Sequence, residues 1–241
     1  MISPLAYVDS SAKIGKNVTI HPFAYIDKNV EIGDACEIMP HASLMSGTRM
    51  GNRNRVFNGA VIAAEPQDFF YKGGDTIAVI GDDNVIRENV VINRSSTAEG
   101  RTSIGNGKFL QEGVHVSHDT RIGNRSVFGY GSKISGNCIL EDYVIFGGNV
   151  LMSQGSRVGA WAMIQTGCRF RKDIPPFIVA AKEPTTYYGV NSFIMSHEGF
   201  SEKVIKHISH AYRIIFQGNS SLTDALLMIK DHVPMSKEIQ H

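Results

Sequence analysis

Apolar residues recur at every sixth position through most of this chain. The series keeps a single phase over residues 2–62, returns over 80–92 and resumes over 104–170. An amphipathic helix has a period of 3.6 residues and a half-buried strand a period of two, so neither produces this repeat. A strict period of six, rich in β-branched residues, is typical of hexapeptide repeats that coil into a parallel β-helix. The pattern therefore predicts a β-helix.

Small side chains follow a second register, two positions before the large apolar residues. Such residues fit the interior of a narrow prism. Cys36, Cys138 and Cys168 all fall in this register, so we expect buried thiols and no disulfide framework. Gly, Asn and Asp residues follow many apolar positions and suit tight corners with positive φ. Three repeats make a coil of 18 residues, so residues 18 apart should stack at about 4.8 Å.

The repeat lapses twice, at residues 64–78 and 94–101. We expect both segments to be loops ejected from the prism. Binding residues usually lie on loops held by a rigid scaffold. The β-helical domain, including both loops, is predicted to span residues 1–173.

The last part of the chain has a different pattern. The period of six ends at Phe170, and the sequence DIPP at residues 173–176 is a strong break. Apolar residues then recur with helical spacing over 201–217, and a second helix is predicted over 223–231. We expect residues 174–241 to form a helical C-terminal domain.

Composition limits the classes of partner. The chain has 24 Lys and Arg against 23 Asp and Glu, a formal net charge of +1, so no long-range attraction to nucleic acid or to a membrane surface is expected. No stretch approaches the roughly 18 apolar residues of a membrane span, and the N-terminus lacks the pattern of a signal peptide. We expect a cytoplasmic protein with no nucleic-acid partner and no integral membrane segment.

The candidate chemistry centres on residues 112–120, EGVHVSHDT. His115 and His118 lie three positions apart, and Asp119 follows directly. Imidazole is the usual general base near neutral pH, and an adjacent carboxylate can orient it. A zinc pair and two surface residues on a turn are the alternatives. A metal site is disfavoured because no third histidine follows until His197.

The 18-residue coil places Gly136 one coil beyond His118, and Gln154 one coil further. A glycine allows a reacting carbonyl to approach its N–H, so Gly136 is a candidate oxyanion donor. A corner glycine needed only for positive φ explains the same residue equally well. Gln154, taken alone, is a solvated turn residue.

Several motifs together resemble one family. They are the hexapeptides, HVSHD, PQD at residues 66–68, DIPPFIVA at 173–180 and YGVN at 188–191. The chain resembles the acyl-carrier-protein-dependent UDP-N-acetylglucosamine O-acyltransferases of lipid A biosynthesis, within the hexapeptide-repeat acyltransferases, over essentially its whole length. The resemblance implies an all-β left-handed parallel β-helix with an α-helical C-terminal extension. It also implies a homotrimer, active sites between neighbouring prisms and no cofactor.

The resemblance implies an activity and residue roles. A 3-hydroxyacyl chain passes from acyl carrier protein to the 3-hydroxyl of UDP-N-acetylglucosamine, the first step of lipid A biosynthesis. His118 is the general base, Asp119 its orienting partner and Gly136 the oxyanion donor, with no metal. The predicted substrate-binding residues are Asp68 at the sugar hydroxyls, His115, Gln154 near the acyl donor, Thr166 along the acyl chain and Asn191 near the nucleotide.

Some positions depart from the family pattern. Lysine, histidine, glutamate or arginine is common in the family where this chain has Phe70, Asn137, Ser153, Phe193, His197 and Glu198. Arginine forks are hard to replace at diphosphates, and glutamate repels phosphate. A paralogue with a different nucleotide-sugar or amine acceptor, and a non-catalytic trimeric scaffold that binds sugar or carrier, are therefore the alternatives.

Two further features bear on the acyl donor. Thr166 stands where glycine is frequent in the family, so a side chain there predicts a shorter preferred acyl chain. Arg169, Arg171 and Lys172 form a local basic cluster. This cluster is either a solvated face or a contact for an acidic carrier protein.

Overall fold

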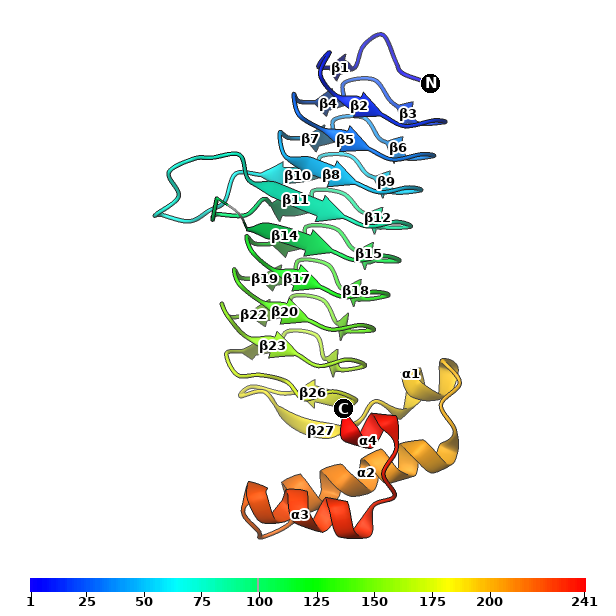
Figure 1. Ribbon diagram of the computed structural model, residues 1–241, viewed down its shortest axis with the longest axis vertical. Helices are drawn as coiled ribbons and strands as arrows, with labels where there is room; N and C mark the ends of the chain where they lie inside the picture. Colours follow the sequence, from blue (N-terminus) through cyan, green and yellow to red (C-terminus); the bar gives the residue numbers. More distant parts are fainter. Residues whose placement is uncertain (99) are drawn as a thin grey trace.

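The computed structural model describes residues 1–98 and 100–241. Short strands stack into three sheets along a tall triangular prism, and the C-terminal helices lie below its last coils (Figure 1). Successive strands of the chain belong to successive sheets, and stacked strands pair in parallel. Each coil therefore places three short strands on three faces, as the period of six predicts.

The three sheets run the length of the prism. The first sheet contains β1 (Tyr7–Val8), β4 (Tyr25–Ile26), β7 (Ser43–Leu44), β10 (Val61–Ala64), β13 (Val91–Asn93), β16 (His115–Val116), β19 (Lys133–Ile134), β22 (Leu151–Met152) and β25 (Arg169–Phe170). The second contains β2 (Lys13–Ile14), β5 (Glu31–Ile32), β8 (Thr48–Met50), β11 (Ile77–Ile80), β14 (Arg101–Ile104), β17 (Arg121–Ile122), β20 (Ile139–Leu140) and β23 (Arg157–Val158). The third contains β3 (Thr19–Ile20), β6 (Glu37–Ile38), β9 (Arg55–Val56), β12 (Val85–Ile86), β15 (Phe109–Leu110), β18 (Val127–Phe128), β21 (Ile145–Phe146), β24 (Met163–Ile164), β26 (Ile178–Ala181) and β27 (Thr186–Val190).

The apolar series fills the prism interior. Its members are buried from Ile20 to Phe170, which confirms the predicted register. Ile2 is exposed because the first coil has no coil stacked before it. The cysteines are free and buried, as predicted. The interior packs as a continuous column of large and small side chains, and this column fixes the height of each corner.

A column of polar side chains runs through part of the interior and was not predicted. Asn54 donates through Nδ2 to the Gly81 carbonyl at 2.8 Å, and Asn84 donates to Asn54 Oδ1 at 2.9 Å. Asn84 Oδ1 accepts the N–H of Lys108 at 2.8 Å. Lys108 is 2% exposed, and its Nζ donates to the Asn106 carbonyl at 3.2 Å. Burial lowers the pKa of Lys108 to about 7.

Both lapses in the period are loops, and both leave the prism at the corner between the first and second sheets. Regular stacked partners are 18 residues apart. The first loop, between β10 and β11, raises the separation to 30, and the second, between β13 and β14, gives 24. The loops therefore add 12 and 6 residues, which are whole repeats, and this preserves the phase. The first loop projects far from the prism (Figure 1).

The C-terminal part begins with strands. β26 continues the third sheet parallel to β24, and β27 pairs with β26 in the antiparallel sense. The helices are α1 (Ser192–His197), α2 (Glu202–Gln217), α3 (Leu222–His232) and α4 (Lys237–Gln240). The helices predicted over 201–217 and 223–231 are confirmed as α2 and α3, whereas β27, α1 and α4 were not predicted. Because the sheet continues to Val190, the division at residue 173 stays a prediction.

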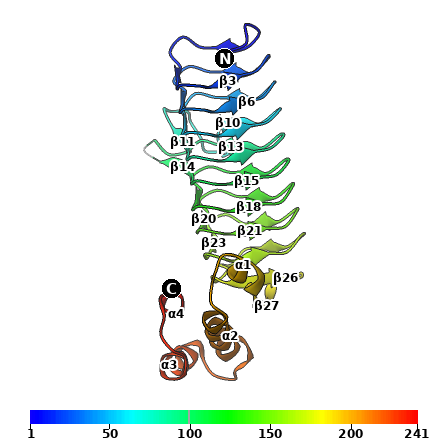
Figure 2. The same ribbon diagram turned by 90° about the vertical axis from the view of Figure 1, so that its right-hand side faces the viewer.

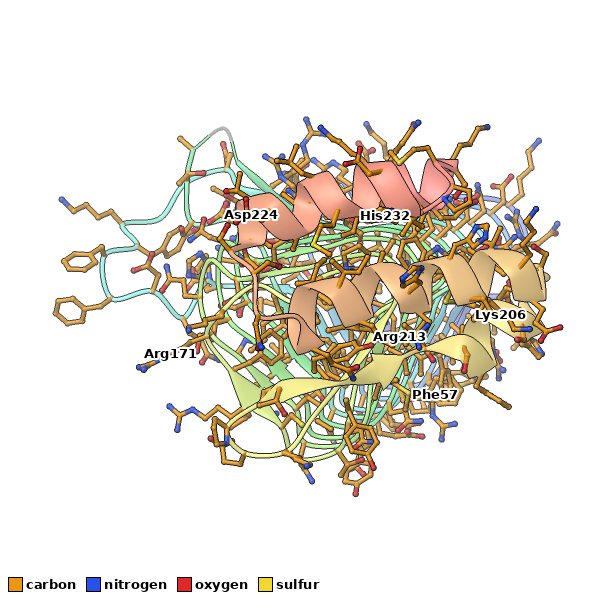
Figure 3. The ribbon with its side chains drawn as sticks, turned by 90° about the horizontal axis from the view of Figure 1, so that it is seen from below. Phe57, Arg171, Lys206, Arg213, Asp224 and His232 are labelled. Carbon is orange, nitrogen blue, oxygen red and sulfur yellow. The ribbon has the colours of Figure 1, made fainter. Side chains whose placement is uncertain are left out.

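The helices lie across the end of the prism. Figure 2 shows α2 and α3 below the last coils instead of along a face. α2, which carries Lys206 and Arg213, lies beside α3, which carries Asp224 and His232 (Figure 3). Tyr212 of α2 anchors the arrangement by donating its hydroxyl to the Pro176 carbonyl at 2.7 Å. Across the described part of the chain, no helix is long and apolar enough to cross a membrane.

Candidate active site

His118 and Asp119 lie at the corner between β16 and β17. Val116 points into the core, so the corner that follows is directed outward, as the period of six predicts. Asp119 has a φ of 58°, in the left-handed region. Its N–H donates to Thr102 Oγ1 at 2.8 Å, which fixes this conformation against β14. His118 is only 7% exposed, so its imidazole is held in the protein surface and is not free in solvent.

The two side chains form a hydrogen-bonded dyad. His118 Nδ1 lies 2.9 Å from Asp119 Oδ2. Burial raises the pKa of Asp119, but hydrogen bonds from Ser95, His118 and Ser96 outweigh burial and lower it below its usual value. An ionised carboxylate can only accept hydrogen bonds, so His118 Nδ1 is the donor. Nε2 of the neutral ring therefore carries the lone pair of a general base.

Gly136 packs directly against the imidazole. A Cβ at this position would lie 2.6 Å from His118 Cε1 and 2.7 Å from Nε2. The positive φ of this corner belongs to Asn137, at 59°, and not to Gly136. The interpretation of Gly136 as a glycine needed for positive φ is therefore wrong. A glycine is needed here because the His118 ring leaves no room for a side chain. Within the described residues, the Gly136 N–H donates to no protein group.

His115 is held by a different set of contacts. Its Nε2 lies 2.7 Å from Asn93 Oδ1, and Asn93 Nδ2 donates to the Glu65 carbonyl at 2.6 Å. Burial lowers the pKa of His115, and the charges of Lys133 and His118 lower it further. His115 is therefore a neutral imidazole that faces the first loop. In residues 1–98 and 100–241, no three His, Cys, Asp or Glu side chains are grouped as metal ligands.

Two more predicted residues share this corner. Gln154 is exposed one coil beyond Gly136, and the Gly155 N–H donates to the Gly136 carbonyl at 3.0 Å. Asp68 lies in the first loop, where its Oδ1 accepts the N–H of Phe70 at 2.9 Å. One edge of the prism therefore carries the dyad, Gly136, Gln154 and the loop with Asp68.

Thr166 and Asn191 lie away from that edge. Thr166 is exposed at the corner between the third and first sheets, where a Cβ on Gly147 would lie 2.7 Å from its Oγ1. Asn191 is 2% exposed and donates through Nδ2 to the Trp161 carbonyl at 2.9 Å, just before α1. Within one chain, the side chain of Asn191 supports the fold. The structure of one chain does not bring either residue to His118.

Comparison with known proteins assigns the chain to a family. The family model described as UDP N-acetylglucosamine O-acyltransferase, domain 2, matches residues 173–241. An acyl-(acyl-carrier-protein)–UDP-N-acetylglucosamine O-acyltransferase from Halorhodospira halophila is 38% identical, and the match covers 99% of this chain and 93% of that protein. This chain belongs to the same acyltransferase family. The resemblance first inferred from the motifs is thereby confirmed.

Solved structures of the acyltransferase family agree with the fold. A UDP-N-acetylglucosamine acyltransferase from Bacteroides fragilis superposes with a TM-score of 0.98 at 52% identity, covering 100% of this chain and 94% of that one. The enzyme from Francisella novicida gives 0.92 at 34% identity, covering 96% and 85%. These matches confirm the left-handed parallel β-helix with a helical C-terminal extension.

The departures from the acyltransferase pattern are mostly on the surface. Phe70 is 81% exposed in the first loop and forms an edge-to-face pair with Phe69. Phe193 is 79% exposed on α1. Glu198 lies 3.2 Å from the neighbouring His197 ring, from Oε1 to Nδ1. Aromatic and acidic groups thus occupy surface positions that are commonly charged in the family.

Sequence reasoning missed Ser95 and Ser96, the closest partners of Asp119 in the second loop. Ser95 Oγ donates to Asp119 Oδ1 at 2.5 Å. Ser96 donates to Oδ2 through its N–H at 3.1 Å and its hydroxyl at 2.9 Å. The separation from Ser95 to Asp119 is 24 residues, one coil plus the six-residue insertion. A stacking rule corrected for this insertion would have identified the pair.

Proposed function

We propose that this protein transfers a 3-hydroxyacyl group from acyl carrier protein to the 3-hydroxyl of UDP-N-acetylglucosamine, the first step of lipid A biosynthesis. The observation that carries the proposal is the packing of His118 Nε2 against Gly136, with Nδ1 committed to Asp119. Membership of the acyltransferase family over 99% of the chain supports it. The protein therefore acts as an enzyme in a biosynthetic pathway of the cytoplasm.

The geometry supports a direct acyl transfer. His118 Nε2 takes the proton of the sugar hydroxyl as its oxygen attacks the thioester carbonyl, a contribution of about 10²–10⁴-fold. Asp119 stabilises the imidazolium that forms. The Gly136 N–H stabilises the oxyanion of the tetrahedral intermediate, worth about 10²–10³-fold. His118 then gives the proton to the departing thiolate as the C–S bond breaks, which returns the ring to its starting state.

The remaining predicted residues would bind substrate. In this proposal, Asp68 and His115 contact the sugar, Gln154 the acyl donor, Thr166 the acyl chain and Asn191 the nucleotide region. Thr166 and His118 occupy different edges of one prism, so a shared substrate needs a neighbouring chain. We therefore include a homotrimer with active sites between prisms.

The acyl carrier protein would approach the edge that carries His118. Arg171 lies at the edge of the prism from which the first loop projects (Figure 3). It is exposed one coil beyond Ser153, the neighbour of Gln154. Its charge makes it a candidate contact for an acidic carrier.

A changed acceptor is the second candidate function. The exposed Phe70 and Glu198 favour it because they cannot supply the positive charge that attracts a diphosphate, and Phe193 cannot replace the polar contact of the glutamate that is common in the family at its position. A nucleotide sugar with a different hydroxyl pattern, or with an amine at the attacking position, would use the same dyad. A scaffold without catalysis would not need a buried, fully hydrogen-bonded dyad.

Turnover with defined substrates tests these candidates. The purified protein is incubated with 3-hydroxyacyl carrier proteins of several chain lengths, and with UDP-N-acetylglucosamine, its 3-amino analogue or other UDP-sugars. Acylated UDP-N-acetylglucosamine is the expected product, and a His118→Ala variant should lose at least about 10²-fold in kcat. Transfer only to another acceptor would support the second candidate. Undiminished transfer by His118→Ala would disprove the assigned base.

A further inference from the structure

We propose that Ser95 and Ser96, in the second loop, are positioning residues that hold the Asp119 carboxylate and fix the tautomer of His118. The inference deepens the proposed function and rests on it for its kinetic readout. Neither serine needs to touch substrate. Their role is to make one orientation and one protonation pattern of the dyad more stable than the others.

Ser95 directs its hydroxyl proton to the carboxylate. The side chain is fully buried, and its Oγ accepts the N–H of Thr97 at 3.0 Å. The same oxygen lies 2.5 Å from Asp119 Oδ1 and 3.1 Å from the Thr97 carbonyl. An ionised carboxylate is the stronger acceptor at the shorter distance, so the proton points to Asp119. This contact fixes the oxygen that does not bind His118.

Ser96 lies between Asp119 and His118 and decides the tautomer. Its Oγ is 2.9 Å from Asp119 Oδ2 and 3.2 Å from His118 Nδ1, but the hydroxyl has one proton. If Ser96 donated to Nδ1, an unprotonated Nδ1 would face the carboxylate at 2.9 Å. If Ser96 donates to Asp119, Nδ1–H can donate to Asp119 Oδ2 and to Ser96 Oγ, and each of the three groups has a hydrogen-bond partner. Only the second arrangement leaves the lone pair on Nε2.

The backbone of the loop preserves this contact. A Cβ on Gly100 would lie 2.4 Å from Ser95 Oγ and 2.7 Å from Asp119 Oδ1. The preceding residue, Arg94, ties the second loop to the first through Tyr71 Oη at 3.3 Å and Glu65 Oε1 at 3.2 Å. Apart from His118, the donors to Asp119 therefore come from the second loop, which Arg94 joins to the first loop.

The electrostatic consequence concerns the ionised form of Asp119. Hydrogen bonds from Ser95 and Ser96 lower the pKa of Asp119, so losing one of them lets the carboxylate take up a proton at a higher pH and weakens its hold on the ring. The other ionisable groups on this side are His115 of β16 and Lys133 of β19. Neither compensates for a lost donor to Asp119. Removing a serine should therefore move the acidic limb of the kcat/KM profile to higher pH.

Kinetics of the serine variants test the inference. Ser96→Ala should lower kcat about tenfold, and the Ser95→Ala, Ser96→Ala double variant about a hundredfold, because small losses of alignment are costly. KM should stay within about twofold for a residue that does not bind substrate. Ser96→Thr restores the hydroxyl and should restore kcat. Ser103→Ala is the control, since the Ser103 hydroxyl makes no hydrogen bond within the described residues.

Nitrogen NMR of His118 separates this inference from the proposed function. Wild-type protein should show Nδ1–H and an unprotonated Nε2, and the double variant a mixture of tautomers. Identical spectra, or unchanged kcat and pH profile in the double variant, would overturn the positioning role. Loss of kcat that Ser96→Thr does not recover would also count against it. A wild-type protein that transfers no acyl group, yet shows the expected spectra, would refute the function alone.

Discussion

Two corners of the same prism use the same backbone group differently. Between the second and third sheets, the N–H of Asn106 donates to Asn124 Oδ1, one coil later, at 3.0 Å. Between the first and second sheets, Gly136 occupies the equivalent position, and Gln154 stands one coil later. The Gly136 N–H has no acceptor within the described chain, and the Gln154 side chain is exposed. The turn is the same, and the side chain one coil later decides whether its N–H is available.

The corner between the second and third sheets repeats this contact along the prism. Asp and Asn side chains accept the N–H of the preceding coil at Asp34, Asn52, Asp82, Asn106, Asn124 and Asp142. Each of these exposed or half-buried hydrogen bonds contributes a net stabilisation of about 0.5–1.5 kcal/mol. At the corner of His118 and Gly136, no Asp or Asn side chain of the described chain accepts the Gly136 N–H. A ligand can therefore take the place of the missing side chain.

The largest expected effect comes from filling the space at Gly136. In Gly136→Ala, the new Cβ would displace the His118 ring, so kcat should fall about 10²–10³-fold while the coils stay folded. Gly155→Ala is the control for backbone strain without a ring contact: its Cβ meets nothing within 4 Å, and its φ of 74° should cost about 1–2 kcal/mol of stability without moving His118. Steady-state kinetics and thermal unfolding of both variants measure the difference. Full activity in Gly136→Ala would remove the ring contact from the explanation.

The second effect concerns Lys108, beside the corner between the second and third sheets. Burial depresses the pKa of Lys108 to about 7, so the folded chain binds fewer protons than the unfolded chain between about pH 7 and 10.5. The free energy of unfolding should therefore rise with pH across that window. At lower pH, the folded protein bears the full cost of burying the charged ammonium. Lys108→Met should raise the free energy of unfolding at pH 6 by about 2 kcal/mol and flatten the pH dependence. Urea unfolding at several pH values, beside the exposed Lys16→Met, provides the measurement.

The third test converts one corner into the other. In Gln154→Asn, the shorter amide can accept the Gly136 N–H as Asn124 accepts that of Asn106. We expect a gain in stability and a fall in kcat of about tenfold, because the oxyanion must compete for the donor. Gln154→Ala removes the same side-chain contacts without adding an acceptor. Equal kinetics of the Asn and Ala variants would contradict the competition.

The smallest effect is the reverse change. Asn124→Ala leaves the Asn106 N–H without its acceptor, and should cost about 1 kcal/mol of stability. Activity should not change, because this corner carries none of the dyad. A change in kcat comparable to that of Gln154→Asn would mean that the two corners are coupled. Chemical unfolding and acyl transfer by the same preparation distinguish these outcomes.

The sequence predicts the features that depend on regular spacing. The period of six identifies Val116 as an interior residue and places His118 at a corner, and stacking brings Gly136 beside it. Adjacent residues also suffice to predict the contact of His118 with Asp119. Spacing could not reveal Ser95, because the insertion shifts its partner from 18 to 24 residues away.

Other features depend on packing that no repeat encodes. Lys108 occupies an interior position reserved for small residues, where Asn84 accepts its N–H and the Asn106 carbonyl accepts its Nζ. Asn191 was expected at a substrate, yet its amide is buried against Trp161 at the start of α1. Its burial depends on how the C-terminal helices dock. That docking follows from long-range contacts such as Tyr212 with Pro176.

The lengths of the two ejected loops have a consequence for engineering. The insertions amount to 12 and 6 residues, so each loop has the length of a whole number of hexapeptide repeats. Variants that lengthen or shorten a loop by six should keep every later side chain on its original face. A change of one residue would force the loop or the wall to absorb the mismatch, since a slip of one position reverses inside and outside along a strand. The corner between the first and second sheets is thus a natural insertion point for new recognition elements.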